Sequence, residues 1–127
     1  MGHKKQIFTM EYPIRCSPSI LYEFLATPSG LQEWFADKVN QRDNTFSFAW
    51  EGATDEAELV AAVENELVRY HWEDDAEDEY FEFKIMTSSV TNETTLLITD
   101  FAADYELKDQ QLLWDSQIND LKQRIGS

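Results

Sequence analysis

Cysteine is nearly absent from this sequence, and a long apolar run is missing altogether. Cys16 is the one cysteine among 127 residues, so the chain cannot form an internal disulfide. A lone cysteine is typical of proteins from reducing compartments. No segment reaches the roughly 18 apolar residues that a membrane-spanning helix requires, and no signal peptide precedes the first strand-like stretch. We therefore expect a cytoplasmic protein without a membrane span.

Basic residues are also scarce. Ten lysines and arginines stand against 25 aspartates and glutamates, which gives a net charge of −15. A field of this sign repels phosphate groups and argues against binding to nucleic acid or to an anionic membrane. Twelve of the acidic residues fall within residues 51–79, where Arg69 is the only basic residue. A high net charge also keeps a small protein soluble, so the charge alone does not indicate a binding partner.

Histidine, a frequent general base, occurs only at His3 and His71. A nucleophilic serine, threonine or cysteine needs such a base within reach. On a predicted strand, His71 points away from its neighbours Tyr70 and Trp72, so we expect a surface or structural histidine. Cys16 precedes a predicted helix start but has no partner histidine, which favours an inert, half-buried thiol. We expect no catalytic residue, no cofactor and no metal ligand, and the sequence favours a protein that is not an enzyme.

The chain does contain a clear change of hydrophobic period. Apolar and polar side chains roughly alternate along residues 4–14, which predicts a strand. Two short helices follow, with starts at Ser17-Pro18 and Thr27-Pro28. From residue 38 to residue 101 the period is two, which predicts about six further antiparallel strands, each covered on one face. Turns between them are predicted at Asp43-Asn44, Gly52, Glu64-Asn65 and Thr91-Asn92.

The strand period decides which side chains share a face of the sheet. Six aromatic side chains are predicted on the covered face: Phe48, Trp50, Tyr70, Trp72, Phe81 and Phe83. Glu82 and Lys84 fall on the opposite face. One strand is expected to present the small or aliphatic series Ala57, Leu59, Ala61 and Val63. The sheet should therefore have one apolar face and one mixed face.

The last predicted element is a long amphipathic helix. Asp104 is its expected cap, Lys122 and Arg124 suit its C-terminal end, and Gly126 suits its stop. Its apolar stripe consists of Leu107, Trp114, Ile118, Leu121 and Ile125. A sheet and one such helix pack economically when the sheet curls and the helix lies across its concave face. We predict an α+β fold in a single domain of residues 1–127, with the two short helices closing one end.

Four segments carry motifs that occur in a fixed order along the chain. SPSILYEFLATPSGLQEWFAD (residues 17–37) contains a Ser-Pro helix start, a Thr-Pro break and the pair Trp34-Phe35, and it is followed by ELVRYHW (66–72), TTLLITDFA (94–102) and LLWDSQINDLKQRI (112–125). This order resembles the START-like, or Bet v 1-like, helix-grip superfamily, in which the last three segments resemble the central strand, the closing strand and the C-terminal helix. The similarity is greatest to the branch named after the activator of the heat-shock chaperone ATPase. It implies a seven-stranded antiparallel sheet that grips the helix around an apolar cavity.

One feature of the wider superfamily has no counterpart. Many pollen-allergen-type members have a glycine-rich loop between early strands, whereas this region holds only Gly52. No phosphate-cradling loop is therefore implied.

An acidic run, EDDAEDE at residues 73–79, interrupts the strand pattern. It lacks the glycine and the alternating ligands of a calcium loop. A solvated turn that protects a strand edge is favoured over a docking surface for a basic partner and over a weak cation site. On this interpretation, removing metal should not unfold the protein.

The aromatic content points instead to an apolar site between sheet and helix. The candidate ligand-binding residues are Trp34, Phe48, Trp50, Leu59, Tyr70, Trp72, Phe81, Phe83, Trp114, Ile118 and Leu121. Three functions remain open: a module for a small hydrophobic or lipid-like ligand, a chaperone-linked protein-interaction domain with an acidic surface, and a cyclase-like enzyme. The polar candidates Arg69, His71, Glu82 and Lys84 lie opposite to the apolar stripes, which argues against the enzyme. The sequence does not indicate an oligomeric state.

Overall fold

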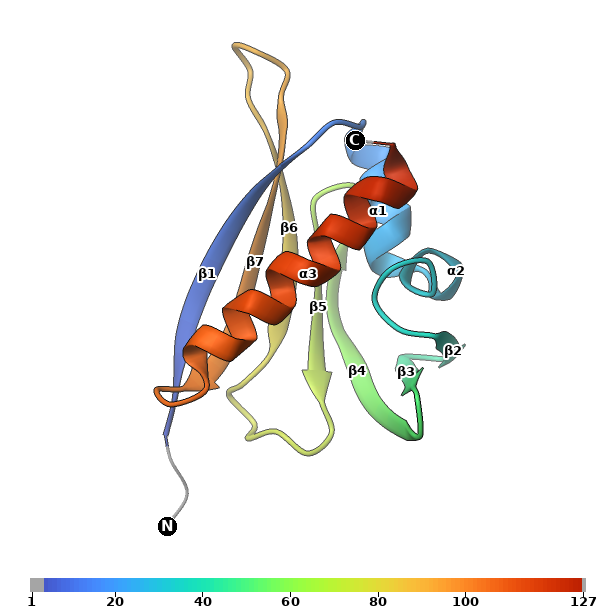
Figure 1. Ribbon diagram of the computed structural model, residues 1–127. Helices are drawn as coiled ribbons and strands as arrows, with labels where there is room; N and C mark the ends of the chain where they lie inside the picture. Colours follow the sequence, from blue (N-terminus) through green and yellow to red (C-terminus); the bar gives the residue numbers. More distant parts are fainter. Residues whose placement is uncertain (1–3, 127) are drawn as a thin grey trace.

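The computed structural model describes residues 4–126, which form a seven-stranded antiparallel sheet and three helices (Figure 1). The elements are β1 (Lys5–Ile14), α1 (Pro18–Ala26), α2 (Pro28–Leu31), β2 (Lys38–Arg42), β3 (Thr45–Trp50), β4 (Ala53–Val63), β5 (Leu67–Trp72), β6 (Phe81–Thr87), β7 (Thr94–Ala103) and α3 (Leu107–Ile125). The strand order is β1-β7-β6-β5-β4-β3-β2. The predicted α+β helix-grip fold is confirmed.

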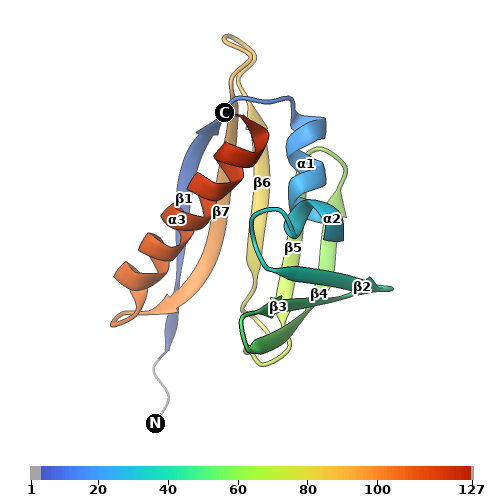
Figure 2. The ribbon, with the colours of Figure 1, turned by 45° about the vertical axis from the view of Figure 1, so that its right-hand side comes forward.

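The helices lie on the concave side of the sheet in two groups. α3 crosses diagonally over β1 and β7, whereas α1 packs on β5 and β6, and α2 lies beside β2 (Figure 1). Figure 2 shows β2 and β3 running across the direction of β5 and β6, so the sheet curls strongly toward the helices. Within residues 4–126, no helix combines the length and the apolar character needed to cross a membrane.

The two short helices begin where the sequence predicts. The Ser17 hydroxyl accepts a hydrogen bond from the Ile20 amide at 3.4 Å, and the Thr27 hydroxyl accepts one from the Gly30 amide at 3.0 Å. Each cap satisfies an amide that the first helical turn leaves unpaired. A side chain at Gly30 would collide with the backbone of Glu23 in α1. Glycine therefore allows α2 to lie directly against α1.

The predicted separation of the two sheet faces is confirmed. Four of the expected aromatic residues are fully buried, and Trp50 and Trp72 are half-buried against the same core. On the opposite face Lys84 is exposed, and the side chain of Glu82 pairs with Arg69 at 2.8 Å. Burial of so many large rings is the main hydrophobic contribution to stability.

The predicted turns are also present. The backbone adopts positive φ at Asp43 (54°), Gly52 (75°), Asn65 (64°) and Asn92 (61°). Aspartate, asparagine and glycine tolerate this left-handed conformation better than other residues. These residues therefore fix the positions at which successive strands reverse.

The expected alternation in β4 is wrong beyond Leu59. Leu59 pairs with Tyr70, but the next register pair joins Ala61 to Arg69, because a bulge inserts one extra residue. Ala61 therefore lies opposite an outward-facing arginine, and Val63 is 44% exposed. A single inserted residue exchanges the two faces of a strand.

The expected cap of the long helix is also wrong. α3 begins at Leu107, and its N-terminal flanking residue is Glu106, whose side chain makes no capping hydrogen bond. Residues 103–106 form a turn in which the Glu106 amide donates to the Ala103 carbonyl at 2.9 Å. This turn places Asp104 too early to cap the helix. The other end is as predicted, with Lys122 and Arg124 in the last turn and Gly126 at φ 85°.

Candidate functional site

The centre of the concave side is occupied by the ring of Phe35. It follows α2 in a short segment, residues 32–37, that leads into β2, and it is 5% exposed. Seven other rings have their centroids 5.2–6.5 Å from that of Phe35: Trp34, Phe48, Trp50, Trp72, Phe81, Phe83 and Trp114. We call these eight residues the aromatic cluster. Phe35 therefore lies among seven of the residues that the sequence predicts for an apolar site between sheet and helix.

A few hydrogen bonds hold this ring in place. The Phe35 amide donates to the Leu31 carbonyl at 2.8 Å, as a continuation of α2. The Phe35 carbonyl accepts from Trp50 Nε1 at 2.9 Å and from Gln117 Nε2 of α3 at 3.2 Å. Next to it, Trp34 Nε1 donates to the Phe24 carbonyl at 2.7 Å. The segment is therefore attached to β3, to α1 and to α3 at the same time.

A groove of about 900 Å³ runs between residues 32–37 and α3. Its lining is Gln32, Glu33, Trp34, Phe35, Ala36, Asp37, Trp50, Leu113, Ser116, Gln117, Asp120, Gln123 and Arg124. Arg124 joins the two walls, because its Nε donates to the Glu33 carbonyl at 3.1 Å and lies 3.8 Å from the Glu33 carboxylate. The groove thus borders the aromatic cluster through Trp34, Phe35 and Trp50.

The eleven candidate ligand-binding residues fall into four groups. Trp34 and Trp50 line the groove. Phe48, Tyr70, Phe81 and Phe83 are buried on the sheet, Trp114, Ile118 and Leu121 are buried on α3, and Leu59 and Trp72 are half-buried beside them. The Tyr70 hydroxyl also donates to the Leu25 carbonyl at 2.7 Å and so attaches the sheet to α1.

Sequence reasoning missed Phe35, Gln117 and Asp100. Phe35 was visible only as a member of the pair Trp34-Phe35, and nothing in the sequence indicates that its ring lies at the centre. Asp100 could have been found, because it has the same parity in β7 as the buried residues Leu96 and Ile98.

Asp100 is a carboxylate on the covered face of the sheet. Its oxygens accept hydrogen bonds from Trp114 Nε1 at 2.9 Å and from the Phe101 amide at 2.8 Å. Burial raises its pKa to about 6, although these two donors and Lys5 act in the opposite direction. A hollow of about 280 Å³ lies beside it, lined by Lys5, Asp55, Glu56, Trp72, Asp74, Asp75, Asp100, Phe101 and Gln110.

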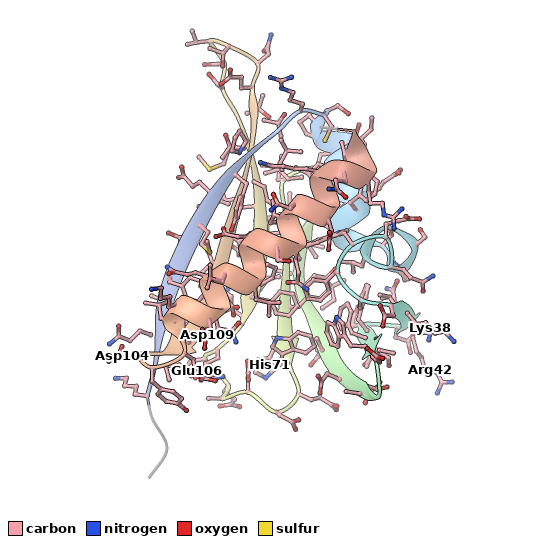
Figure 3. All side chains as sticks on the ribbon, in the orientation of Figure 1. Lys38, Arg42, His71, Asp104, Glu106 and Asp109 are labelled. Carbon is pink, nitrogen blue, oxygen red and sulfur yellow. The ribbon has the colours of Figure 1, made fainter. Side chains whose placement is uncertain are left out.

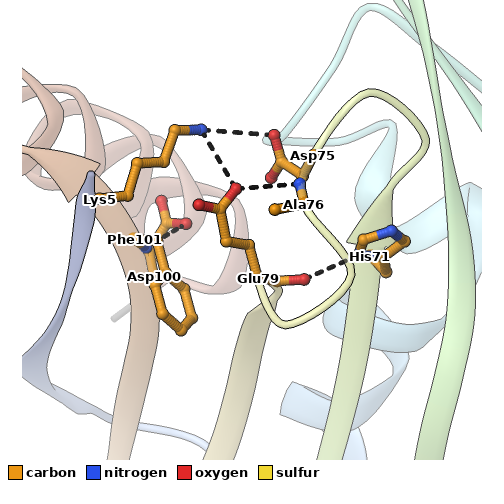
Figure 4. Close-up of polar contacts among 7 residues, drawn as sticks. All are labelled: Lys5, His71, Asp75, Ala76, Glu79, Asp100 and Phe101. Carbon is orange, nitrogen blue, oxygen red and sulfur yellow. Dashed lines mark hydrogen bonds and ion pairs between the residues drawn. The ribbon is translucent and has the colours of Figure 1, made fainter. Parts of the chain in front are cut away.

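The acidic run forms the loop between β5 and β6, as predicted. Figure 4 shows Lys5 reaching from β1 to this loop, where its Nζ lies 3.4 Å from Asp75 and 3.7 Å from Glu79. The Glu79 carboxylate in turn accepts from the Ala76 amide at 3.2 Å. Within residues 4–126, no group of three or more histidine, cysteine or acidic side chains is arranged to hold a metal ion.

His71 and Cys16 have environments that are typical of structural residues rather than catalytic ones. His71 Nδ1 lies 2.7 Å from the Glu79 carbonyl oxygen, so the ring helps to close the β5–β6 loop (Figure 4). Cys16 is half-buried, and burial raises the pKa of its thiol. A raised pKa disfavours the reactive thiolate, as expected for an inert cysteine.

Comparison with known proteins gives one family and several solved relatives. A model described as a START-like superfamily domain matches residues 1–127. A Bacteroides fragilis protein solved by NMR is 36% identical, with a TM-score of 0.69, over 96% of this chain and 92% of that chain. The Aha1 dimer from Colwellia psychrerythraea is 18% identical, with a TM-score of 0.76, over 92% and 93%. A Mesorhizobium loti protein is 17% identical, with a TM-score of 0.79, over 95% and 97%. No curated protein matches the chain.

Proposed function

The chain belongs to the START-like superfamily, and from this premise we propose that it is a non-enzymatic binding module for a small hydrophobic ligand. The ligand enters through the groove between residues 32–37 and α3. Its apolar part then takes the place of the Phe35 ring between the sheet and the helix. Phe35 acts as a plug that closes the site when the ligand is absent.

The observation that carries this proposal is that the groove and the aromatic cluster share three residues. Trp34, Phe35 and Trp50 line the groove and also contact the other rings of the cluster. A volume of about 900 Å³ is suitable for a small molecule, since ligand pockets commonly measure ~300–1,000 Å³. A ligand in the groove therefore needs only one ring to move before it reaches the buried aromatic surface.

A ligand ring in the place of Phe35 can make the same kinds of contact, because aromatic pairs pack in both offset-stacked and edge-to-face arrangements. Aromatic pairs contribute only ~0.5–1.5 kcal/mol beyond their buried area. A second apolar ring in the same space recovers both the buried area and most of these contacts. The plug lies in a short segment between α2 and β2, and its side of the groove is joined to α3 by Gln117 and Arg124. These two contacts must break if residues 32–37 move away from α3, and Trp50 Nε1 must also release the Phe35 carbonyl if that carbonyl moves.

The position of the polar side chains supports binding rather than catalysis. Arg69 and Glu82 form an ion pair on the outer face, and His71 hydrogen-bonds to the Glu79 carbonyl. These groups are on the side of the sheet away from the aromatic cluster. Asp100 is the exception, but its carboxylate is held by Trp114 and by the Phe101 amide.

The test is a fluorescence titration with fatty acids, sterols and polycyclic aromatic compounds. Trp34 and Trp50 border the groove, so a ligand there should change the tryptophan emission. Leu113 lines the groove and is 51% exposed, whereas its neighbour Leu112 is 58% exposed and does not line it. Leu113→Glu should weaken binding and Leu112→Glu should not. If no compound binds below ~1 mM, near −4 kcal/mol, the proposal fails.

A second candidate function is a chaperone-linked protein-interaction domain. The observation in its favour is the concentration of acidic groups on β4 and the β5–β6 loop. Glu56 and Glu73 lie close enough for the Glu56 charge to raise the pKa of Glu73. Native mass spectrometry separates the two candidates, because a retained small molecule supports the ligand-binding module. A dimer without retained ligand supports the interaction domain.

A further inference from the structure

We propose that the groove selects a hydrophobic amine: a small molecule with an apolar body and one protonated amino group. The apolar body lies against Trp50, Phe35 and Leu113, and the amino group lies near Asp37 and Asp120. This inference rests on the proposed function and adds the charge of the ligand to it.

The charges that line the groove are mostly negative. Glu33, Asp37 and Asp120 contribute three carboxylates, and Arg124 contributes the one cation of the lining. Arg124 is already engaged, because its Nε donates to the Glu33 carbonyl at 3.1 Å and lies 3.8 Å from the Glu33 carboxylate. Glu33 and Arg124 therefore compensate each other and leave Asp37 and Asp120.

These two carboxylates are available to a ligand. Both are exposed, and within residues 4–126 neither side chain makes a hydrogen bond or an ion pair. Lys38 and Arg42, the basic residues that follow Asp37 in sequence, extend from the edge strand β2, away from α3 (Figure 3), and neither lines the groove. The basic residues nearest to Asp120 are Lys122, which does not line the groove, and Arg124, which is one helical turn away and already paired with Glu33. A cation in the groove would therefore meet two unpaired negative charges.

The apolar lining complements this charge. Trp50 is half-buried and lines the groove, and an indole ring attracts an ammonium group as well as an apolar body. An anionic lipid such as a fatty acid carries the wrong charge for Asp37 and Asp120. It would also have to remove Arg124 from Glu33 before finding a cationic partner. The protein's net charge of −15 also favours an amine over an acid, because it enriches cations near the surface.

The experiment compares three ligands with the same apolar body: naphthylmethylamine, naphthylmethanol and naphthoic acid. Calorimetric titration at low salt should give the amine the highest affinity and the acid the lowest, with about a tenfold difference between them. High salt should reduce this difference, since the carboxylates are exposed to solvent. The alcohol measures the apolar contribution alone.

Matched variants locate the charge effect. Asp37→Asn and Asp120→Asn should each weaken binding of the amine about 1.5- to 5-fold, the range expected for one exposed ion pair, and should affect the uncharged alcohol less than the amine. Asp104→Asn removes the same charge at an exposed position outside the groove and should change neither ligand.

The outcomes separate this inference from the proposed function. If the alcohol binds and the amine binds no better, the inference is overturned while the binding module stands. The same holds if the amine is favoured but the two variants have no effect, because the attraction then comes from elsewhere. If none of the three compounds binds, the proposed function itself fails for this ligand class.

Discussion

The groove beside Phe35 and the hollow beside Asp100 both border the aromatic cluster, but the buried side chains next to them are held by different kinds of interaction. At the groove, the buried group is a ring that packs edge-to-face on Phe48 and stacks on Trp114, and another aromatic ring can adopt the same arrangements. At the hollow, the buried group is a carboxylate that needs its two hydrogen-bond donors. A ring can be replaced by another apolar body, whereas a hydrogen-bonded charge cannot. From this comparison we expect the Phe35 side to be adaptable and the Asp100 side to be fixed.

Removal of the Phe35 ring gives the largest expected effect. Phe35→Ala should lower the free energy of unfolding by about 3–5 kcal/mol, because it leaves a cavity among the other rings. The cavity should accept small aromatic molecules, which should restore part of the lost stability. Urea denaturation with and without benzene or indole measures both effects.

A control on the outer face of the sheet distinguishes this effect from the general cost of losing a ring. Phe101 is half-buried and contacts Tyr80 with ring centroids 5.2 Å apart. Phe101→Ala should cost only about 1–2 kcal/mol, since less apolar area is lost, and it should leave the rings around Phe35 in place. Equal losses for the two variants would contradict a central role for Phe35.

Neutralisation of Asp100 tests whether the buried carboxylate beside the hollow contributes to stability as described. The folded-state pKa of about 6 lies above the ordinary value of 3.8, so the folded protein binds this proton more tightly than the unfolded chain does. The resulting stability is present below pH 4 and is lost as the pH rises through 6. A shift of this size corresponds to a loss on the order of 2–3 kcal/mol.

Asp100→Asn should remove this pH dependence. The difference in free energy of unfolding between wild type and variant should therefore change between pH 4 and pH 6, as measured by urea denaturation at each pH. Asp109→Asn, an exposed change in α3, provides the control. A wild-type minus variant difference that stays constant across this range would show that Asp100 titrates normally.

A smaller effect is expected where Lys5 attaches the β5–β6 loop. Its ion pairs with Asp75 and Glu79 are partly exposed, so Lys5→Ala should cost no more than about 1 kcal/mol, and less at high salt. Lys4→Ala changes the same charge at an exposed neighbour and should cost less. Thermal melts of both variants at two salt concentrations measure the difference. A larger, salt-independent loss would mean that the loop depends on more than these ion pairs.

Removal of metal should have no effect on stability. The acidic loop has neither the ligand spacing nor the glycine of a structural calcium site. The melting temperature should therefore be the same with and without a chelator. A fall of several degrees that calcium restores would assign a structural ion to residues 73–79.

Much of the fold could be predicted because its signals are local. Ser17, Thr27, Asn65 and Asn92 mark helix starts and turns through their own backbone preferences. The period of two placed Phe81 and Phe83 correctly on the covered face. The bulge after Leu59 was not visible in the same pattern, because a register shift depends on the partner strand.

The candidate site was less predictable, since it depends on contacts between distant segments. The sequence places Trp34 and Trp50 near an apolar site, but the contact between the Phe35 carbonyl and Gln117 joins residues 82 positions apart. Likewise, the environment of Asp100 depends on Trp114, from a helix that follows its strand. Neither of these contacts can be predicted from the hydrophobic period of the segments that form it.

The most direct test of the account is an NMR measurement of where the Phe35 ring lies when a ligand is bound. In the free protein, protons of Phe35 should show nuclear Overhauser contacts to Phe83 and Trp114, whose rings lie 6.3 and 6.0 Å away between centroids. At saturation with naphthylmethylamine, we predict that these contacts disappear and that the ligand shows contacts to Phe83 and Trp114 instead. Persistence of the Phe35 contacts in the saturated complex would show that Phe35 is a fixed part of the core and not a plug.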